Sequence, residues 1–433
     1  MKVEIEKMGF AGSGIGHLPD GRIVFIKKTV PGDIVEIELL DDKKDFAFGK
    51  VNKLIKPSDD RIEPDCPYFY SCGGCEHQNI PYCKQLEIKQ SLIDESLRRN
   101  GIEANAEKII PGSSKLFFYR NSIRFMFDLD SNNQLKIARH AYPDDRKLVQ
   151  VDKCLLQSET SNLIAKTIID FVNANVSSKK SFWQLKIREG KKTTEFMIEI
   201  ITSSHDLTGE KGIIENLKSI EGVKSIYHTI APAKSLLNLK RRLIFGSPVV
   251  YEKIGRYTFQ ISPESFFQTN SEGVKTLYDK IKEFANIEIG DEIIDLYCGT
   301  GSIGIYLSTL AKKVIGIEVV PAAIRDANDN ARINKIKNIE FICSNINSLA
   351  IQQYNNCIII VDPPRAGLSK ELIQKLSDVK WKRLIYVSCN PATFARDLRL
   401  FMEKGIIATK IQPIDMFPQT HHTELVAELK KSR

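Results

Sequence analysis

Residues 292–308 read "EIIDLYCGTGSIGIYLS", and this stretch decides the fold. The apolar run over 292–296 predicts a buried strand, and the residues after Gly304 predict a helix. Between them lies a turn that contains Gly299, Gly301 and Gly304. Such a turn between a strand and a helix lets the backbone approach a ligand closely. The stretch therefore predicts a ligand site at the edge of a sheet.

Two acidic residues near this turn narrow the choice of ligand. Asp295 lies just before it, and Glu318 ends the next strand-like run, "VIGIEV", where an acid can accept both ribose hydroxyls. Dinucleotide-binding and S-adenosylmethionine-binding folds both use the glycine turn. S-adenosylmethionine carries a sulfonium and an amino group but no pyrophosphate, so an acidic rim favours it over a nicotinamide cofactor.

Strand and helix patterns alternate from about residue 264 to the end of the chain. This rhythm predicts a parallel, doubly wound α/β sheet of Rossmann-like type. The expected strands are "EIIDLYC", "KVIGIEV", "IEFICS", "CIIIVD", "RLIYVSC" and "ELVAELK".

The fourth of these strands runs into "VDPPRAGL", residues 361–368. Asp362 is expected at the carboxyl edge of the sheet, where ligands of such folds bind. The two prolines that follow stiffen the loop. Methyltransferases that act on amino groups favour an aromatic residue where this chain has Arg365, so chemistry on an exocyclic amine is not indicated.

Cys389 lies one strand further along the same edge, in "RLIYVSCNPATFARDL", residues 383–398. A structural cysteine would normally lie inside the apolar run, not at its polar exit. Glu424 begins the last strand-like run, "ELVAEL". A thiolate and a carboxylate at this edge suggest a nucleophile and a base.

This pair suits methylation of carbon 5 of uracil, which is a poor nucleophile. A thiolate that adds to carbon 6 creates an enolate, whose carbon 5 can attack a sulfonium methyl group. A base then removes the carbon 5 proton so that the cysteine can leave by β-elimination. We expect Cys389 to be the nucleophile and Glu424 the base.

A second group of cysteines lies in "EPDCPYFYSCGGCEHQ", with Cys66, Cys72 and Cys75. Three close thiolates in a reducing compartment predict a soft metal, and three ligands alone leave zinc and an iron–sulfur cluster both open. The fourth ligand is either Cys83 or Cys154.

The rest of the chain predicts two further parts. Residues 1–60 form short strand-like runs separated by Gly and Pro, typical of a small barrel of oligonucleotide-binding type. Residues 61–262 contain the cysteine loop, a polar helix over about 84–99 and mixed strands and helices. We therefore expect domains at 1–60, 61–262 and 263–433, the first two binding RNA. Phe117, Phe118 and Tyr119 are expected to be mainly core, and the His421–His422 pair mainly surface.

Composition limits the class of protein. The 433 residues carry a formal net charge of +8, which fits a polyanionic partner. There is no apolar run of membrane-spanning length and no signal peptide pattern, so we expect a cytoplasmic protein without a membrane partner.

Five motifs in order carry a resemblance: "ISPESFFQTN", "DLYCGTGSIG", "IIVDPPRAGL", "VSCNPATFARDL" and "HHTELVAEL". They resemble the RNA uracil-5-methyltransferase family, especially its 23S ribosomal RNA branch, and residues 1–60 look like that family's TRAM domain. The resemblance implies a class I methyltransferase fold with Cys389 and Glu424 catalytic. It implies S-adenosylmethionine contacts from Gln268, Tyr297, Ser302, Glu318, Asn345 and Asp362.

The resemblance also selects Cys154 as the fourth ligand, beside Cys66, Cys72 and Cys75, and implies a [4Fe-4S] cluster. Cys83 would then be a packing residue. We expect a monomer that needs no protein partner and methylates a uridine of 23S ribosomal RNA. Two alternatives stay open: the same chemistry on transfer RNA, and a non-catalytic iron–sulfur protein that binds RNA.

Overall fold

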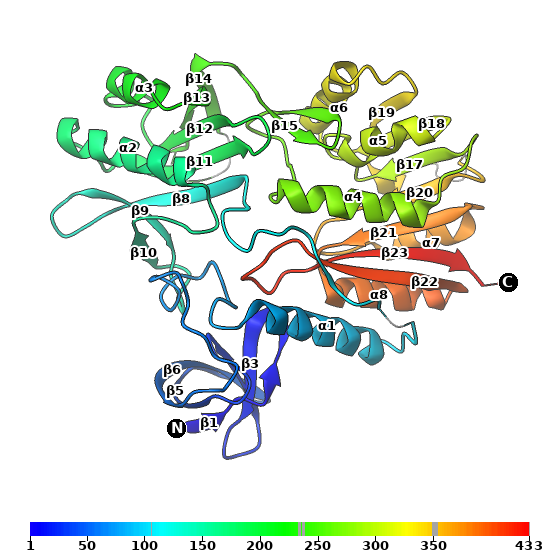
Figure 1. Cartoon of the computed structure of the whole chain (residues 1–433), viewed down its shortest axis with the longest axis horizontal. Coiled ribbons are helices and arrows are strands. Elements are labelled where there is room, and N and C mark those ends of the chain that lie inside the picture. Colours follow the sequence, from blue (N-terminus) through cyan, green and yellow to red (C-terminus); the bar gives the residue numbers. More distant parts are fainter. Residues whose placement is uncertain (105, 233–234, 236–238, 349–353, 433) are drawn as a thin grey trace.

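The computed structural model describes residues 1–433 except 105, 233–234, 236–238, 349–353 and 433. Its described strands form three main sheets and one hairpin (Figure 1). The N-terminal barrel, in blue, lies below; the central sheet, in cyan and green, and the C-terminal sheet, in yellow to red, lie above it.

The C-terminal sheet has the strand order β19-β18-β17-β20-β21-β23-β22-β7. The five strands from β19 to β21 are parallel, as predicted from the strand and helix rhythm. The chain adds β18 and β19 on one side of β17 and then β20 and β21 on the other, so the strand order switches between β17 and β20. Ligands of such sheets bind at this switch point. The strands are β17 (Glu292–Leu296), β18 (Lys313–Glu318), β19 (Ile339–Cys343), β20 (Ile358–Val361), β21 (Arg383–Ser388), β22 (Ile406–Asp415), β23 (Glu424–Lys431) and β7 (Ile110–Pro111).

The last part of this sheet corrects the expectation of an all-parallel arrangement. β23 is antiparallel to both β21 and β22. The physical reason is the connection, because β22 and β23 follow each other without the helix that a parallel crossover requires. The predicted Rossmann-like fold class is nevertheless confirmed.

Alternating apolar residues cover both faces of the sheet. Ile293, Ile358 and Ile360 face one core, with α4 (Ser271–Ala285), α5 (Ser302–Leu307) and α6 (Pro321–Ile333). Ile294 and Ile359 face the other, with α7 (Lys370–Asp378), α8 (Pro391–Met402) and α1 (Tyr82–Arg99).

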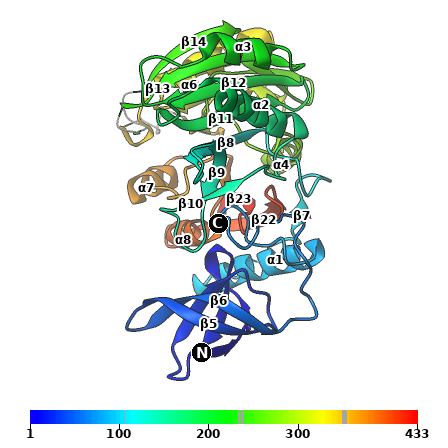
Figure 2. The same cartoon turned by 90° about the vertical axis from the view of Figure 1, so that its left-hand side faces the viewer.

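Helix α1 belongs to the core of the C-terminal sheet, although it precedes the central sheet in sequence. Ile93 and Leu97 of α1 are buried with Leu425 and Leu429 of β23. β7 also joins this sheet, pairing with β22. Figure 2 shows α1 between the barrel and the C-terminal sheet. The predicted domain boundaries at residues 60 and 262 stay a prediction. Residues 82–111, which fall in the predicted central domain, pack with the C-terminal sheet.

The barrel strands have the order β1-β5-β6-β4-β3-β2 around a small apolar core that includes Val24, Ile26 and Val35. They are β1 (Lys2–Glu4), β2 (Lys7–Met8), β3 (Ser13–His17), β4 (Ile23–Lys27), β5 (Ile34–Asp42) and β6 (Phe46–Lys56). Short 3-10 turns lie at Phe10–Gly12, Ser308–Leu310 and Ile346–Ser348.

The central sheet has the order β10-β9-β8-β11-β12-β13-β14, and helices α2 (Glu159–Asn175) and α3 (Glu210–Lys218) pack on it. Its strands are β8 (Ser122–Leu129), β9 (Leu135–His140), β10 (Leu148–Val151), β11 (Phe182–Gly190), β12 (Glu195–Thr202), β13 (Val223–Ile230) and β14 (Lys240–Gly246). A hairpin of β15 (Val250–Ile254) and β16 (Tyr257–Ile261) follows. Among the described residues, no helix is long and apolar enough to cross a membrane.

We predict that Lys89→Ala destabilises the protein by about 3–5 kcal/mol. Lys89 Nζ lies 2.6 Å from Asp415 Oδ1, both side chains are fully buried, and the change leaves one buried charge without its partner. The control, Lys7→Ala, breaks a solvated pair with Glu95 and should cost no more than about 1 kcal/mol. Urea unfolding of both variants measures the difference, and equal losses would contradict the prediction.

Candidate functional site

The glycine turn after β17 has the left-handed backbone that its sequence predicts. Gly299 has φ 54° and Gly301 has φ 76°. A Cβ at Gly301 would lie 2.4 Å from the Phe341 ring, whereas one at Gly299 would meet open space. Tyr297 has φ 63°, which is costly for a residue with a side chain and typical of functional sites. The turn thus holds Tyr297 at the carboxyl end of β17 with space beside Gly299.

Three carboxyl groups lie together around this turn. Asp295 is fully buried; its Oδ2 accepts a hydrogen bond from the Gly304 N–H at 3.1 Å, and its Oδ1 has no partner among the described residues. Burial, with nearby Asp362 and Glu318, raises the pKa of Asp295 to about 8. Loss of solvation raises the pKa of Asp362 to about 7. A cationic ligand beside these acids would favour their ionised forms.

Glu318 is oriented by backbone N–H groups at the end of β18. Its carboxylate accepts from Gly299 at 3.3 Å, Val319 at 2.8 Å and Val320 at 3.0 Å. The side chain therefore joins the end of β18 to the glycine turn, as an acid that binds ribose hydroxyls would.

The remaining predicted ligand residues lie at different distances from this centre. Ser302 Oγ, at the start of α5, is 2.6 Å from the Tyr278 hydroxyl, and Tyr278 is buried near Asp295 and Asp362. Tyr278 was missed from the sequence, because it lies in the ordinary apolar pattern of α4. Asn345 is exposed after β19, and its Oδ1 accepts from the Asn347 N–H at 2.9 Å. Gln268 lies between β16 and α4.

The structure brings Cys389 and Glu424 together through the register of two strands. The antiparallel pairing of β21 and β23 ends at Ser388 and Leu425, and Cys389 and Glu424 are the chain neighbours of these two residues at that end. Opposed residues of such a pair have Cα atoms about 4.5–5.5 Å apart. Cys389 and Glu424 therefore lie together at the end of this strand pair, where Glu424 contributes to the raised pKa of the Cys389 thiol.

Burial favours the neutral forms of both groups in the free protein. Burial, with Glu424 and Asp362 nearby and Arg365 opposing, raises the pKa of Cys389 to about 11. Glu424 is 3% exposed, and its Oε2 has no partner in the described part of the chain. Burial, with Asp362 nearby, raises the pKa of Glu424 well above its usual range.

Arg365 is a cation that acts on both groups, because it opposes the rise in the pKa of Cys389 and of Glu424. Its backbone carbonyl accepts from Asn390 Nδ2 at 3.2 Å and from Thr393 Oγ1 at 3.1 Å, which fixes the loop after β20 against α8. Its Nη2 lies 3.2 Å from His422 Nε2. His422 is partly buried in this contact, so the interpretation of the histidine pair as surface residues is wrong.

The four predicted metal-binding cysteines line one cavity of about 260 Å³. Cationic side chains share its wall, and burial raises the pKa of Cys75 to about 12. Among the described residues, no three His, Cys, Asp or Glu side chains are arranged to hold a metal ion. Cys83 does not line the cavity and is exposed on α1, which contradicts its interpretation as a packing residue. The cavity wall includes Cys66, Cys72, Cys75, Cys154, Arg120, Arg124, Arg139 and Lys153.

The aromatic segment before β8 is only partly core. Tyr119 is buried, and its hydroxyl donates to the Pro418 carbonyl at 3.1 Å. Phe118, in contrast, is 41% exposed with φ 56°, and the segment is not a strand.

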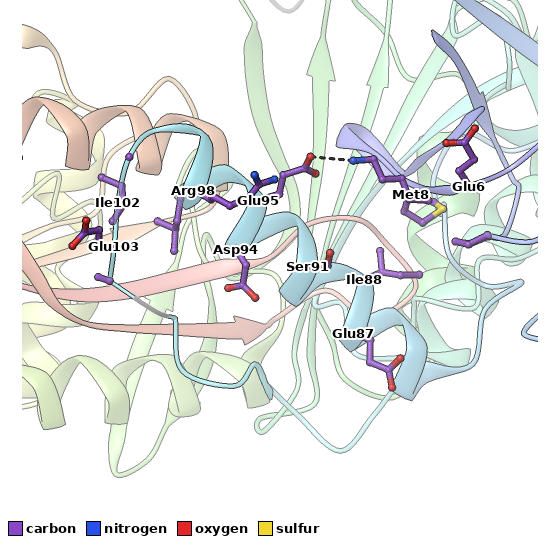
Figure 3. A pocket seen from close by; sticks show the side chains of 15 residues that line it. Glu6, Met8, Glu87, Ile88, Ser91, Asp94, Glu95, Arg98, Ile102 and Glu103 are labelled. Carbon is purple, nitrogen blue, oxygen red and sulfur yellow. Dashed lines mark hydrogen bonds and ion pairs between the residues drawn. The ribbon is translucent and has the colours of Figure 1, made fainter. Parts of the chain in front are cut away.

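A larger cavity, of about 840 Å³, lies away from this chemistry, between the barrel and α1 (Figure 3). The ion pair of Lys7 and Glu95 joins its two walls. Acidic side chains outnumber basic ones in its lining, which is unsuited to phosphates. The acids are Glu6, Glu87, Asp94, Glu95 and Glu103.

Comparisons with known proteins agree along the whole chain. The family described as tRNA (Uracil-5-)-methyltransferase matches residues 81–432, and the TRAM domain matches residues 1–51. The chain is 34% identical over 445 residues to an uncharacterized RNA methyltransferase from Halalkalibacterium halodurans, covering 99% of this chain and 96% of the relative. It is 34% identical over 447 residues to another from Clostridium acetobutylicum, with the same coverage.

One similar solved structure is that of Pyrococcus abyssi tRNA (uracil-54, C5)-methyltransferase in complex with S-adenosyl-L-homocysteine. It has a TM-score of 0.79 and 29% identity, and the match covers 99% of both chains.

We predict that iodoacetamide alkylates Cys389 about tenfold faster for each pH unit from 8 to 10, since its pKa of about 11 keeps the thiolate scarce below that pH. Arg365→Gln removes the nearby positive charge and should slow the reaction at any one pH. Peptide mass spectrometry separates Cys389 from the exposed Cys83 and Cys343. A rate that levels off near pH 8.5 would contradict the prediction.

Proposed function

Because the chain belongs to the tRNA (uracil-5-)-methyltransferase family, we propose that it methylates carbon 5 of a uridine through a covalent bond between Cys389 and the uracil ring. The chain is an S-adenosylmethionine-dependent RNA methyltransferase with an N-terminal TRAM domain. The observation that supports the proposal is that Cys389 and Glu424 lie at the same end of the β21–β23 pair.

S-adenosylmethionine supplies an electrophilic methyl group on a cationic sulfur. We assign its binding to Gln268, Tyr297, Ser302, Glu318, Asn345 and Asp362. A cation at this edge favours the charged forms of Cys389 and Glu424, which burial disfavours in the free protein. The pKa values of Cys389 and Glu424 are then high only in the free site, and binding of the methyl donor lowers them.

Cys389 then attacks uracil, and its sulfur bonds to carbon 6. Carbon 5 of the resulting enolate takes the methyl group. Glu424 accepts the proton that carbon 5 loses, and the bond between carbon 6 and sulfur breaks to release Cys389 and 5-methyluridine. Oε2 of the buried Glu424 has no hydrogen-bond partner within the described residues, so this oxygen is available to accept the proton.

The four-cysteine cavity supports a bound [4Fe-4S] cluster held by Cys66, Cys72, Cys75 and Cys154. The four thiols line the same cavity, and this is the observation that supports the proposed cluster. Arg120, Arg124 and Arg139 would balance the charge of the thiolates. Methyl transfer moves no electrons, so the proposed role of the cluster is to hold the cysteine loop in place.

For the substrate we propose a uridine of 23S ribosomal RNA, on the resemblance of the cysteine loop to the ribosomal branch. Transfer RNA is the second candidate, favoured by the similarity to the Pyrococcus abyssi enzyme, which is a tRNA (uracil-54, C5)-methyltransferase. Residues outside the catalytic sheet must make this choice, because the chemistry is the same on both.

We predict that the wild-type protein forms an adduct resistant to denaturation with RNA that contains 5-fluorouridine, because fluorine cannot leave as a proton does. Cys389→Ala should abolish this adduct, whereas Glu424→Gln should still form it. Gel electrophoresis with 23S ribosomal RNA and with transfer RNA transcripts reads both results. An adduct formed by Cys389→Ala would refute the assignment of Cys389 as the nucleophile. An adduct that forms with transfer RNA and not with 23S ribosomal RNA would make transfer RNA the substrate.

We predict that Cys154→Ser lowers bound iron by at least half after anaerobic purification, because one of four ligands is removed. Cys83→Ser, an exposed cysteine outside the cavity, should leave the iron content unchanged. Iron analysis and visible absorbance measure both. Zinc in place of iron in the wild-type protein, or equal loss in both variants, would contradict the assignment.

A further inference from the structure

The segment before Glu424 is anchored by the cysteine loop. Residues 416–423 connect β22 to β23, longer than the usual two to five residues of a hairpin connection. The backbone N–H groups of Glu76 and His77 both donate to the Gln419 carbonyl at 3.1 Å. Glu76 directly follows Cys75, so the end of the cysteine loop bonds to the segment that leads to Glu424.

The side chain of Glu76 makes a second attachment to this segment. Its Oε2 accepts from the His421 backbone N–H at 3.3 Å and lies 3.2 Å from His421 Nδ1. Glu76 is 7% exposed, so the carboxylate is shielded from water that would otherwise compete. This contact joins residues that are 345 positions apart in the sequence.

Helix α1 holds the same segment from another side. Gln85 Nε2 donates to Gln419 Oε1 and Gln85 Oε1 accepts from the Gln419 N–H, both at 3.0 Å. Gln85 Nε2 also lies 3.0 Å from the His77 carbonyl. Gln419 is therefore fixed by α1 and by the cysteine loop together.

A short series of contacts continues from Glu76 to the reacting groups. The rings of His421 and His422 lie with centroids 4.0 Å apart, and His422 contacts Arg365. Thr423 and Glu424, which follow, are both buried. A displacement at His421 is therefore transmitted to Glu424 within three residues of chain.

We propose that Glu76 is a positioning residue that holds the 416–423 segment, so that the cysteine loop sets the placement of Glu424. The inference rests on the proposed function of Glu424 as the base. It gives the cysteine loop a role in one step, the removal of the carbon 5 proton, in addition to any role in RNA binding. Addition of Cys389 should depend on Glu76 much less, because Cys389 is fixed by β21 and α8.

The test is Glu76→Ala assayed with ordinary and with 5-fluorouridine RNA. Loss of a hydrogen bond to a charged group should lower kcat on ordinary RNA about 10- to 100-fold. A methylated covalent adduct with ordinary RNA should accumulate, because its release needs the base. The rate of adduct formation on 5-fluorouridine RNA, which has no carbon 5 proton, and the Kd for RNA should change less than threefold.

Two further variants serve as controls. Glu63→Ala removes an exposed glutamate three residues before Cys66 and should behave as the wild-type protein. Glu76→Gln keeps an oxygen acceptor for the His421 N–H and should recover part of kcat. Iron content is measured in each protein, so that loss of the cluster is detected separately.

Three results would overturn the inference. The first is an unchanged kcat in Glu76→Ala. The second is an equal loss of the adduct with ordinary RNA and of the adduct with 5-fluorouridine RNA. The third is a loss of iron together with a loss of binding, adduct formation and turnover; the second and third results would make Glu76 merely structural. Failure of the wild-type protein to form any adduct with 5-fluorouridine RNA would instead refute the proposed function itself.

Discussion

The antiparallel pairing of β21 with β23 is the constraint on which the site depends. Side chains of a strand alternate between faces, so a shift of one residue in this pairing would send Glu424 to the opposite side of the sheet from Cys389. Buried apolar residues on both faces of β23, among them Val426 and Ala427, make such a shift costly. The cores that stabilise the sheet thereby also fix the geometry of the two groups.

Burial favours the neutral forms of three acids and one thiol in the free site. Asp295, Asp362, Glu424 and Cys389 are all protonated more readily than in water, because burial penalises their charged forms. On the proposed function, a cationic methyl donor would offset that penalty and would favour the thiolate of Cys389.

Much of the fold could be predicted from the sequence, because the five parallel strands and their helices have strong apolar periodicity. β22 was missed, since its run over 406–415 is interrupted by polar residues and Pro413. Without β22, the direction of β23 could not be predicted. The pairing of Cys389 with Glu424 was inferred from chemistry. That β21 and β23 bring them to the same end of one strand pair could be seen only in the structure.

Other contacts were beyond sequence reasoning because they join distant segments. Nothing in the pattern of α1 marks Lys89 as the buried partner of Asp415, or Gln85 as a partner of Gln419. The same holds for Glu76, which looks like one more polar residue beside a cysteine. The gathering of Cys154 with the cysteine loop was implied by resemblance alone, and the cavity supplies the physical basis.

The path of the chain around the central sheet has a consequence for how such enzymes diversify. The Asn121 N–H donates to the Thr269 carbonyl at 2.8 Å, and Arg120 bridges to Asn270, so the chain leaves the catalytic body and returns to it at one point. Between these points the β15–β16 hairpin packs with α4 in the catalytic core, whereas the strands from β8 to β14 form a separate sheet. Changes of sequence or length within that sheet can therefore leave the two anchoring contacts in place.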